Sequence, residues 1–326
     1  MLETEEPLMT LRPLLAALTL LLVPADADAE EPLPPEEPAA EEPAAEKAPP
    51  PAPSPYFHFA PVLGAQVFPL GVGVYGTPQL RVSLYRSESK LFQTTHFGIG
   101  AWWRVTPAFA EVGPRIDFTP LEMLTLSVTG RYVGSWTGSA GSRIPVAALE
   151  NKRYATRAGA EGEAVATDAF ELIISPTLRL KGGPVIVLYN FSWTHTWLFF
   201  RDGDTPQPVY DGGVDLYIAP ADRIIQQQAV VLGEILDGTK TKTVLRLGGT
   251  VRHKRARVTE DRSVNVGFIG TVKPIPHVAM PDIIVQVLAY VLDDSGERVL
   301  WAPNVVLAFR WTFEKGPGVR GIPGVE

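Results

Sequence analysis

The sequence predicts an all-β protein that forms a transmembrane antiparallel up-and-down β-barrel of about 12 strands. Apolar and polar residues alternate along most of the chain from residue 56 to 313, which is the period of strands with two different faces. Many of these runs reach about ten residues, the length that a tilted strand needs to cross a bilayer. No stretch of about 18 apolar residues offers a membrane-spanning helix instead. About ten or fourteen strands, or a soluble β-sandwich, are the alternatives.

The alternation is clearest in the last predicted strand. Val305, Leu307 and Phe309 fall on one face, whereas Ala308 and Arg310 fall on the other. An apolar outer face and a polar inner face are typical of a membrane barrel. Such a sheet must close, because an open edge in hydrocarbon leaves backbone groups without hydrogen bonds.

Turn residues between the alternating runs set the expected strand boundaries. The predicted strands cover residues 57–67, 71–86, 93–105, 108–118, 122–135, 168–181, 184–200, 222–236, 241–252, 262–272, 281–292 and 298–313. Residues 222–236 alternate least regularly. Short connections at 119–121, 181–184 and 237–240 are expected on the periplasmic side, and 136–167 and 201–221 are expected as long outer loops.

Two segments precede the predicted barrel. Residues 1–29 have the organisation of a secretory signal peptide, with Arg12 before an apolar run and small residues at the expected cleavage site. Residues 30–55 consist almost entirely of Pro, Glu and Ala, a composition that favours an extended periplasmic linker without a core. The barrel is expected at 56–313, followed by a C-terminal tail at 314–326.

The composition excludes several kinds of chemistry. The chain has no cysteine, so it has no disulfide framework and no catalytic thiol. Its histidines are scattered, which argues against a metal site, and no cofactor motif is present. No basic tract with interleaved aromatic residues indicates nucleic acid as a partner. Because no histidine has serine two positions later, the pairing typical of barrel hydrolases is missing, and the sequence predicts a protein that is not an enzyme.

Charged residues on the polar faces are mostly basic. The predicted lumen residues are Arg81, Arg104, Glu111, Arg115, Asp117, Arg131, Glu171, Arg179, Lys181, Arg246, Arg252 and Arg310. Rings of one charge tune the selectivity of pores, so these residues are compatible with a pore for small anionic solutes. In a narrow barrel the same residues can instead pair across the lumen and fill it.

The segment Asn304-Val305-Val306-Leu307-Ala308-Phe309-Arg310-Trp311-Thr312-Phe313 resembles the terminal strand of bacterial outer-membrane β-barrel proteins. The resemblance is to the general class, covers residues 56–313 and indicates no subfamily. It implies location in the cell outer membrane, contact with its lipids, and recognition by the barrel assembly machinery. The residues of the implied assembly signal are Leu307, Phe309, Trp311 and Phe313. The tail after Phe313 departs from the pattern, because such signals commonly end the chain.

Three functions remain open from the sequence. The first is a passive small-solute or anion-preferring pore, with a plugged barrel as its closed counterpart. The second is a structural or surface-binding barrel that acts through its outer loops and periplasmic linker. An outer-membrane hydrolase is the least favoured of the three.

Overall fold

The computed structural model describes the barrel region of the chain. The described residues are 55–67, 71–85, 95–135, 143–145, 167–200, 207–211, 213–237, 243–274, 280–294 and 303–315. The predicted signal peptide, the linker up to residue 54 and the tail beyond residue 315 lie outside them. No helix among the described residues is long and apolar enough to cross a membrane.

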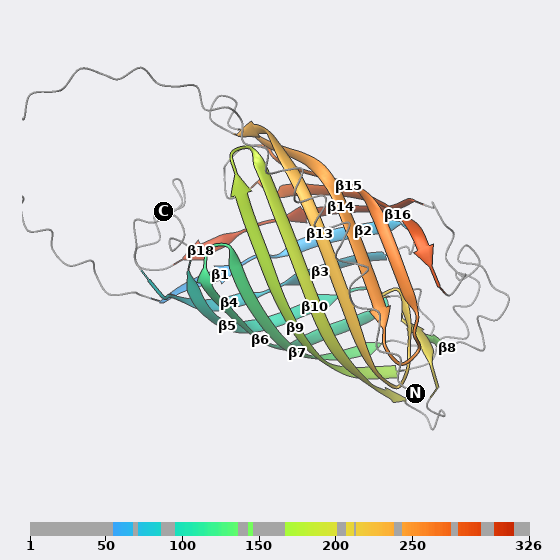
Figure 1. Ribbon diagram of the computed structural model, residues 1–326. Helices are drawn as coiled ribbons and strands as arrows, with labels where there is room; N and C mark the ends of the chain where they lie inside the picture. The colour runs from blue at the N-terminus through green and yellow to red at the C-terminus, as the bar shows by residue number, and fades with distance from the viewer. Residues whose placement is uncertain are drawn as a thin grey trace, which may run out of the picture. The chain divides into compact units, whose positions relative to one another are not determined.

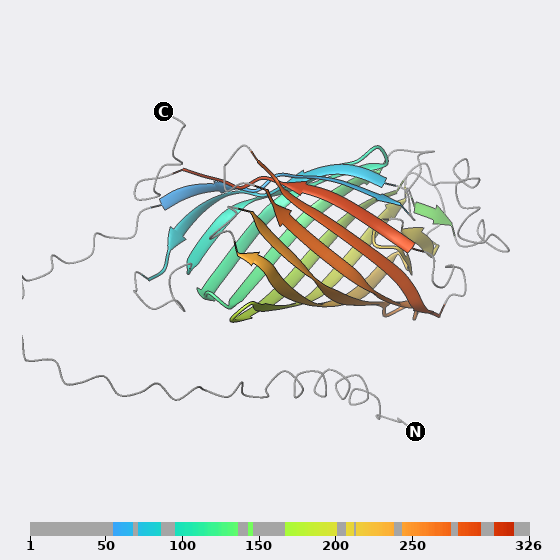
Figure 2. The ribbon, with the colours of Figure 1, turned by 90° about the horizontal axis from the view of Figure 1, so that it is seen from above.

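The main sheet closes on itself as a barrel (Figures 1 and 2). Its strands are β1 (Pro55–Phe59), β2 (Val62–Val67), β3 (Gly71–Gly76), β4 (Pro78–Ser83), β5 (His96–Val105), β6 (Phe109–Leu121), β7 (Leu124–Ser135), β9 (Thr167–Gly182), β10 (Val185–Phe200), β13 (Ala221–Asp237), β14 (Val244–Ala256), β15 (Arg262–Lys273), β16 (Asp282–Asp293), β17 (Pro303–Arg310) and β18 (Phe313–Lys315). Every neighbouring pair is antiparallel, and β17 pairs with β2 to close the ring.

Three barrel strands are interrupted in the middle. β1 and β2 are separated at Pro61, which has no backbone N–H for the ladder, and the facing strand breaks between β17 and β18. The amide of Trp311 donates to the carbonyl of Pro61 across this break at 3.0 Å. β3 and β4 are separated at Thr77. Counting each interrupted pair once gives the closed antiparallel barrel of 12 strands that the sequence predicts.

The two faces of the sheet meet different surroundings. One face carries buried polar side chains such as Glu111 and Thr129, which are 3% and 5% exposed. The other face exposes large apolar side chains, including Leu247 at 50% and Phe268 at 77%. In a closed barrel the buried polar face is the lumen side, so the exposed apolar face is the surface available to lipid.

The weak alternation of residues 222–236 has a structural cause. These residues lie in β13, whose inward positions include Ile224, Val230 and Leu232, all nearly buried. Val230 and Leu232 pack with Ile186 of β10 in an apolar cluster on the lumen wall. Because both faces of this strand are partly apolar, apolar and polar residues alternate only weakly along it, although the strand is one of the longest in the barrel.

Parts of the predicted outer loops form a second, small sheet. It contains β8 (Arg143–Pro145), β11 (Val209–Asp211) and β12 (Leu216–Ile218), in the order β12, β11, β8. β8 belongs to the predicted loop 136–167, and the other two belong to 201–221. The small sheet lies at one end of the barrel (Figure 1), and β12 contacts the barrel strand β14.

Candidate functional site

The inner face holds the charged residues that the sequence assigns to the lumen. Strand register places some of them opposite carboxylates on neighbouring strands, as with Arg131 opposite Glu171 and Arg246 opposite Glu234. The inward-facing members are Arg81, Arg104, Glu111, Arg115, Asp117, Arg131, Glu171, Arg179, Lys181, Arg246, Arg252 and Arg310. Most of these cations have carboxylate partners, so the lumen is not a ring of unpaired positive charge.

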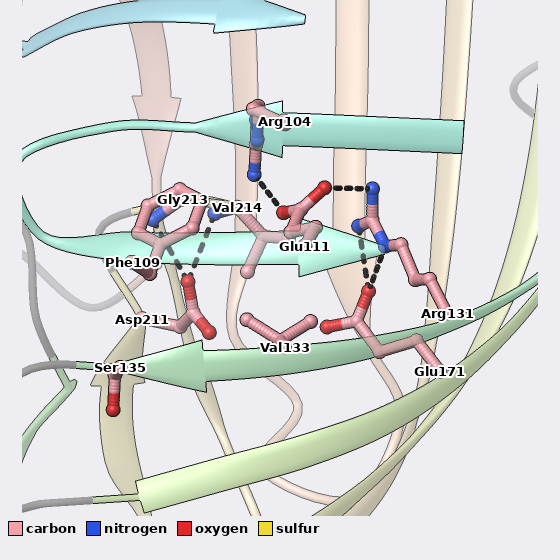
Figure 3. Close-up of a pocket in the computed structure, with 10 residues that line it drawn as sticks. All are labelled: Arg104, Phe109, Glu111, Arg131, Val133, Ser135, Glu171, Asp211, Gly213 and Val214. Carbon is pink, nitrogen blue, oxygen red and sulfur yellow. Dashed lines mark hydrogen bonds and ion pairs between the residues drawn. The ribbon is translucent and has the colours of Figure 1, made fainter. Parts of the chain in front are cut away.

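The largest ion-pair network joins four consecutive strands, β5, β6, β7 and β9 (Figure 3). Arg131 donates to Glu171 at 2.6 Å and to Glu111 at 2.8 Å. Glu111 also accepts from Arg104 and, at 2.9 Å, from the indole of Trp102. Both carboxylates are nearly buried, at 3% exposure each. The network therefore satisfies charged groups that would be costly to bury alone.

A second network lies on the neighbouring part of the wall. Arg115 donates to Asp117 at 2.9 Å and to the hydroxyl of Ser127 at the same distance. Asp117 also accepts from Gln79, whose amide oxygen accepts from Arg81 at 2.9 Å. Arg81 is thus tied to the same carboxylate through an amide rather than by a direct ion pair.

The remaining predicted cations lie elsewhere on the wall. Glu234 accepts from Lys181 at 3.1 Å and from Arg246 at 2.8 Å. Arg310 donates to Asp282 at 2.7 Å near a strand end, where its side chain is 48% exposed. Among the described residues, Arg179 and Arg252 have no carboxylate within ion-pair distance.

The feature that sequence reasoning missed is a segment that folds back against the inner wall. We call residues 209–218, which comprise β11, β12 and the turn between them, the inserted segment. Asp211 shapes the turn, because its carboxylate accepts from the amides of Gly213 at 2.8 Å and Val214 at 3.1 Å. Asp215 completes the turn with a φ of 58°, in the left-handed region.

Apolar packing holds the inserted segment on the wall. Val209, Leu216 and Ile218 have no exposed surface. They form one cluster with buried residues from β7, β9, β10, β13 and β14. The wall residues of this cluster are Val133, Ala169, Leu198, Ile224 and Ala256. A segment with three fully buried side chains is part of the folded core rather than a solvated loop.

Polar contacts then fix the segment across the lumen. The carboxylate of Asp215 accepts from the hydroxyl of Tyr210 at 2.6 Å and from the hydroxyl of Tyr290 on β16. Lys254 of β14 donates to the carbonyl of Val214 at 2.7 Å. Asp261, between β14 and β15, accepts from the amide of Tyr217 at 2.8 Å. The segment is therefore attached to the strands β14 and β16 and to the connection between β14 and β15, as well as to its own turn.

Two small cavities remain beside the inserted segment, and Gly213 lines both. The first, about 20 Å³, lies against the ion-pair network of Arg131 (Figure 3). The second, about 60 Å³, lies toward β2 and β17, where Gln66 and Asn304 line it. Both are far smaller than the roughly 300–1,000 Å³ of a small-molecule site. Among the described residues no cluster of acidic or histidine side chains could hold a metal ion.

The residues of the implied assembly signal lie at the closing seam of the barrel. Leu307 and Phe309 are in β17, opposite Ala65 and Leu63 of β2. Trp311 falls in the break, and Phe313 begins β18, stacked on Phe59 at 6.4 Å between ring centroids. β18 continues to Lys315, two residues beyond the predicted end of the barrel at residue 313.

The fold and its two faces define the class of protein. A closed antiparallel barrel that is apolar outside and polar inside satisfies every backbone group in hydrocarbon, which an open sheet cannot do. The protein is an outer-membrane β-barrel protein, located in the cell outer membrane.

Comparisons with known proteins find only distant structural similarity. No protein-family profile and no curated protein sequence matches the chain. A solved structure of the β-domain of the Bordetella autotransporter BrkA is similar at 9% identity, with a TM-score of 0.42, over 80% of this chain and 100% of that one. An anion-selective porin from Comamonas acidovorans has 6% identity, a TM-score of 0.31, and coverage of 80% and 99%. LpxR from Salmonella typhimurium has 7% identity, a TM-score of 0.33, and coverage of 80% and 99%.

Proposed function

We propose that the protein is a plugged outer-membrane barrel, whose lumen is closed at rest by the inserted segment, and not a constitutively open pore. The observation that carries the proposal is the burial of Val209, Leu216 and Ile218 against the inner wall. A loop that only covered the barrel opening would leave these side chains exposed to water.

The size of the barrel supports the need for a plug. Side chains alone fill a barrel of about 8 strands, whereas barrels of about 16–18 strands enclose an aqueous channel. The present barrel lies between these two cases, so the inward side chains leave space along the axis. At the end of the barrel that holds the small sheet, the inserted segment crosses that space from Phe109 and Val133 on one side to Lys254 and Tyr290 on the other.

The pairing of the lumen charges also favours a closed barrel. Selectivity by a charged ring requires charges that face the passing ion. Here Arg104, Arg115 and Arg131 are held by buried carboxylates. Passage of small anionic solutes would therefore require displacement of the inserted segment. Such solutes would then meet Arg252 and Lys254, which line the second cavity.

The proposal includes no catalytic activity. His195 and His253 fall on outward strand positions, and His58 contacts Glu314 at 3.0 Å. None of these three histidines is thereby paired with a serine nucleophile. The proposed partners are the lipids of the outer membrane and the barrel assembly machinery, which would recognise the strand containing Leu307 and Phe309.

Conductance in planar bilayers tests the proposal. The full-length protein should give no discrete conductance steps after verified insertion. Replacing residues 209–218 with a Gly/Ser linker of equal length should open the lumen and produce steps with a weak preference for anions. Heat-modifiable migration on gels reports whether each variant is still a folded barrel.

A matched replacement distinguishes a plug from general loosening of the loops. The same Gly/Ser linker in place of residues 148–157, in the other long connection, should leave the bilayer silent. Steps from the unmodified protein would contradict a closed resting state. Silence from the folded 209–218 replacement would contradict the assignment of this segment as the plug.

A further inference from the structure

A basic cluster lies on the outer surface of the barrel, at the end that holds the small sheet. We call Arg223, His253, Arg255, Arg257 and Arg262 the rim patch. Strand pairing joins its members: Arg255 of β14 lies opposite Arg262 of β15 and opposite Ile225 of β13. The amide of Arg257 donates to the carbonyl of Arg223 at 3.0 Å.

The outward direction of these side chains follows from alternation. Asp222 and Ile224 flank Arg223 and are buried on the inner face, at 0% and 4% exposure. Lys254 and Ala256 flank Arg255 and are likewise buried. Among the strand side chains that the structure describes, the outward face carries no lysine, and its only arginines are Arg223, Arg255 and Arg262.

The position of the patch along the strands is that of a membrane interface. From the row of Arg255 and Arg262 toward the middle of the strands, the next outward-facing row holds Gln227 beside His253. The row after that is apolar and holds Ala229, Val251 and Val266. An outward arginine costs about 2–4 kcal/mol near the middle of the bilayer and about 0–1 kcal/mol near its surface. The arginines therefore stand where the apolar surface gives way to lipid headgroups.

Aromatic residues mark the same level on the adjacent strand. His195 of β10 lies directly opposite Arg223, between Trp193 and Trp197 on the outward face. Its ring centroid is 4.0 Å from that of Trp197 and 6.0 Å from that of Trp193. Tryptophan rings are enriched at the headgroup level of membranes, which agrees with the level assigned to the arginines.

Protein carboxylates neutralise only part of the patch. Arg262 donates to Asp294 at 2.9 Å. Asp222 and Asp261 are nearby but buried, and both accept backbone amides. Glu260 is exposed between β14 and β15. Among the described residues, Arg223, Arg255 and Arg257 have no carboxylate within ion-pair distance.

We propose that the rim patch binds the phosphate group of an anionic membrane lipid headgroup. Guanidinium groups bind phosphate oxygens through paired, charge-assisted hydrogen bonds. The patch faces lipid, carries surplus positive charge, and continues directly into the apolar surface that would contact the acyl chains. A lipid fits both features, because its phosphate can contact the arginines and its acyl chains can contact the apolar surface. A free phosphate would contact the arginines alone.

Native mass spectrometry of the full-length protein in neutral detergent tests this binding. The probes are phosphatidic acid, which carries a phosphomonoester, and phosphatidylcholine, which has no net charge. The unmodified protein should retain phosphatidic acid in preference to phosphatidylcholine. The double variant Arg223→Gln/Arg255→Gln should bind phosphatidic acid about 30-fold more weakly, which corresponds to about 1 kcal/mol for each arginine removed.

The control removes the same charge from the opposite end of the barrel. Lys181→Gln/Lys273→Gln also takes away two positive charges, and both lysines lie far along their strands from the patch. This variant should bind phosphatidic acid like the unmodified protein. Heat-modifiable migration verifies that both variants are folded.

Three results would overturn the proposal. The first is equal retention of phosphatidic acid and phosphatidylcholine by the unmodified protein. The second is an equal loss of affinity in the two double variants, which would show a general charge effect. The third is displacement of phosphatidic acid by inorganic phosphate at comparable concentration, which would show a site for free phosphate rather than for a lipid.

Discussion

Replacement of Arg131 by Met should strongly destabilise the barrel. The guanidinium lies between Glu111 and Glu171, and its side chain is 12% exposed, against 2% and 3% for the two carboxylates. Removing one partner of a buried ion pair costs about 3–5 kcal/mol, because the remaining charge loses its compensation. Glu111 keeps its contact with Arg104, so most of the effect should come from Glu171.

The free energy of unfolding can be measured by urea titration of the protein folded into lipid vesicles, with migration on gels as the readout. Arg310→Met is the matched control, because its ion pair with Asp282 lies near a strand end with 48% exposure of the arginine side chain. Loss of such an exposed pair should cost about 0–1 kcal/mol. Adding Glu171→Gln to Arg131→Met should recover part of the stability, since an uncharged amide is easier to bury than an unpaired carboxylate.

Equal losses for Arg131→Met and Arg310→Met would refute the reasoning. That result would mean that water screens the network of Arg131 as effectively as it screens a strand end. Because the inserted segment covers one side of this network, the same result would also argue against a closed lumen.

Two further substitutions test the faces of the barrel. Leu307→Arg places a cation on the lipid face and should cost about 2–4 kcal/mol, more than Arg310→Met on the inner face, in the same urea titration; the opposite ranking would invert the assigned faces of β17. Gly267→Val should lower the folded yield, because a Cβ at this position would lie 1.9 Å from the carbonyl oxygen of Val287. Gly182→Val is the control and should leave the yield nearly unchanged, because a Cβ there would have no atom within 4 Å.

Most of the barrel could be predicted because lipid and lumen impose opposite requirements on alternate residues. Long strands such as β9 and β10 repeat that contrast many times, so their positions stand out. The predicted strand boundaries differ from the observed ones where charge interrupts the pattern. The predicted strand 241–252 stops before His253-Lys254-Arg255, whereas β14 continues to Ala256. Charged residues at a strand end resemble a loop in sequence, and this concealed the rim patch.

The inserted segment could not be predicted from the period of the sequence. β11 and β12 have three residues each, too few to establish alternation, and the turn between them is rich in glycine and aspartate. Such composition usually indicates a surface loop. The available signal was apolar content, because Val209, Tyr210, Leu216 and Ile218 are unusual in a solvated loop.

The partners of the lumen charges depend on register, which a single sequence does not specify. Arg131 and Glu171 are separated by 40 positions and become neighbours only when β7 pairs with β9 in the observed register. A one-residue slip would turn every side chain of a strand to the opposite face. Alternation therefore indicates that both residues point inward, but it cannot show that they neutralise each other.

The arginines of the barrel separate into two groups for one physical reason. On the inner face, the side chains of Arg131 and Arg115 are 12% and 25% exposed, and both are held by carboxylates. On the outer face, Arg223 and Arg255 have no such partners among the described residues and occur only at the strand ends, where headgroups can solvate them. A water-filled lumen would remove the need for the first group's partners, since an arginine in water needs none. The close pairing inside is the arrangement that the proposed closed lumen requires, and the confinement of outward arginines to the rim is the arrangement that lipid requires.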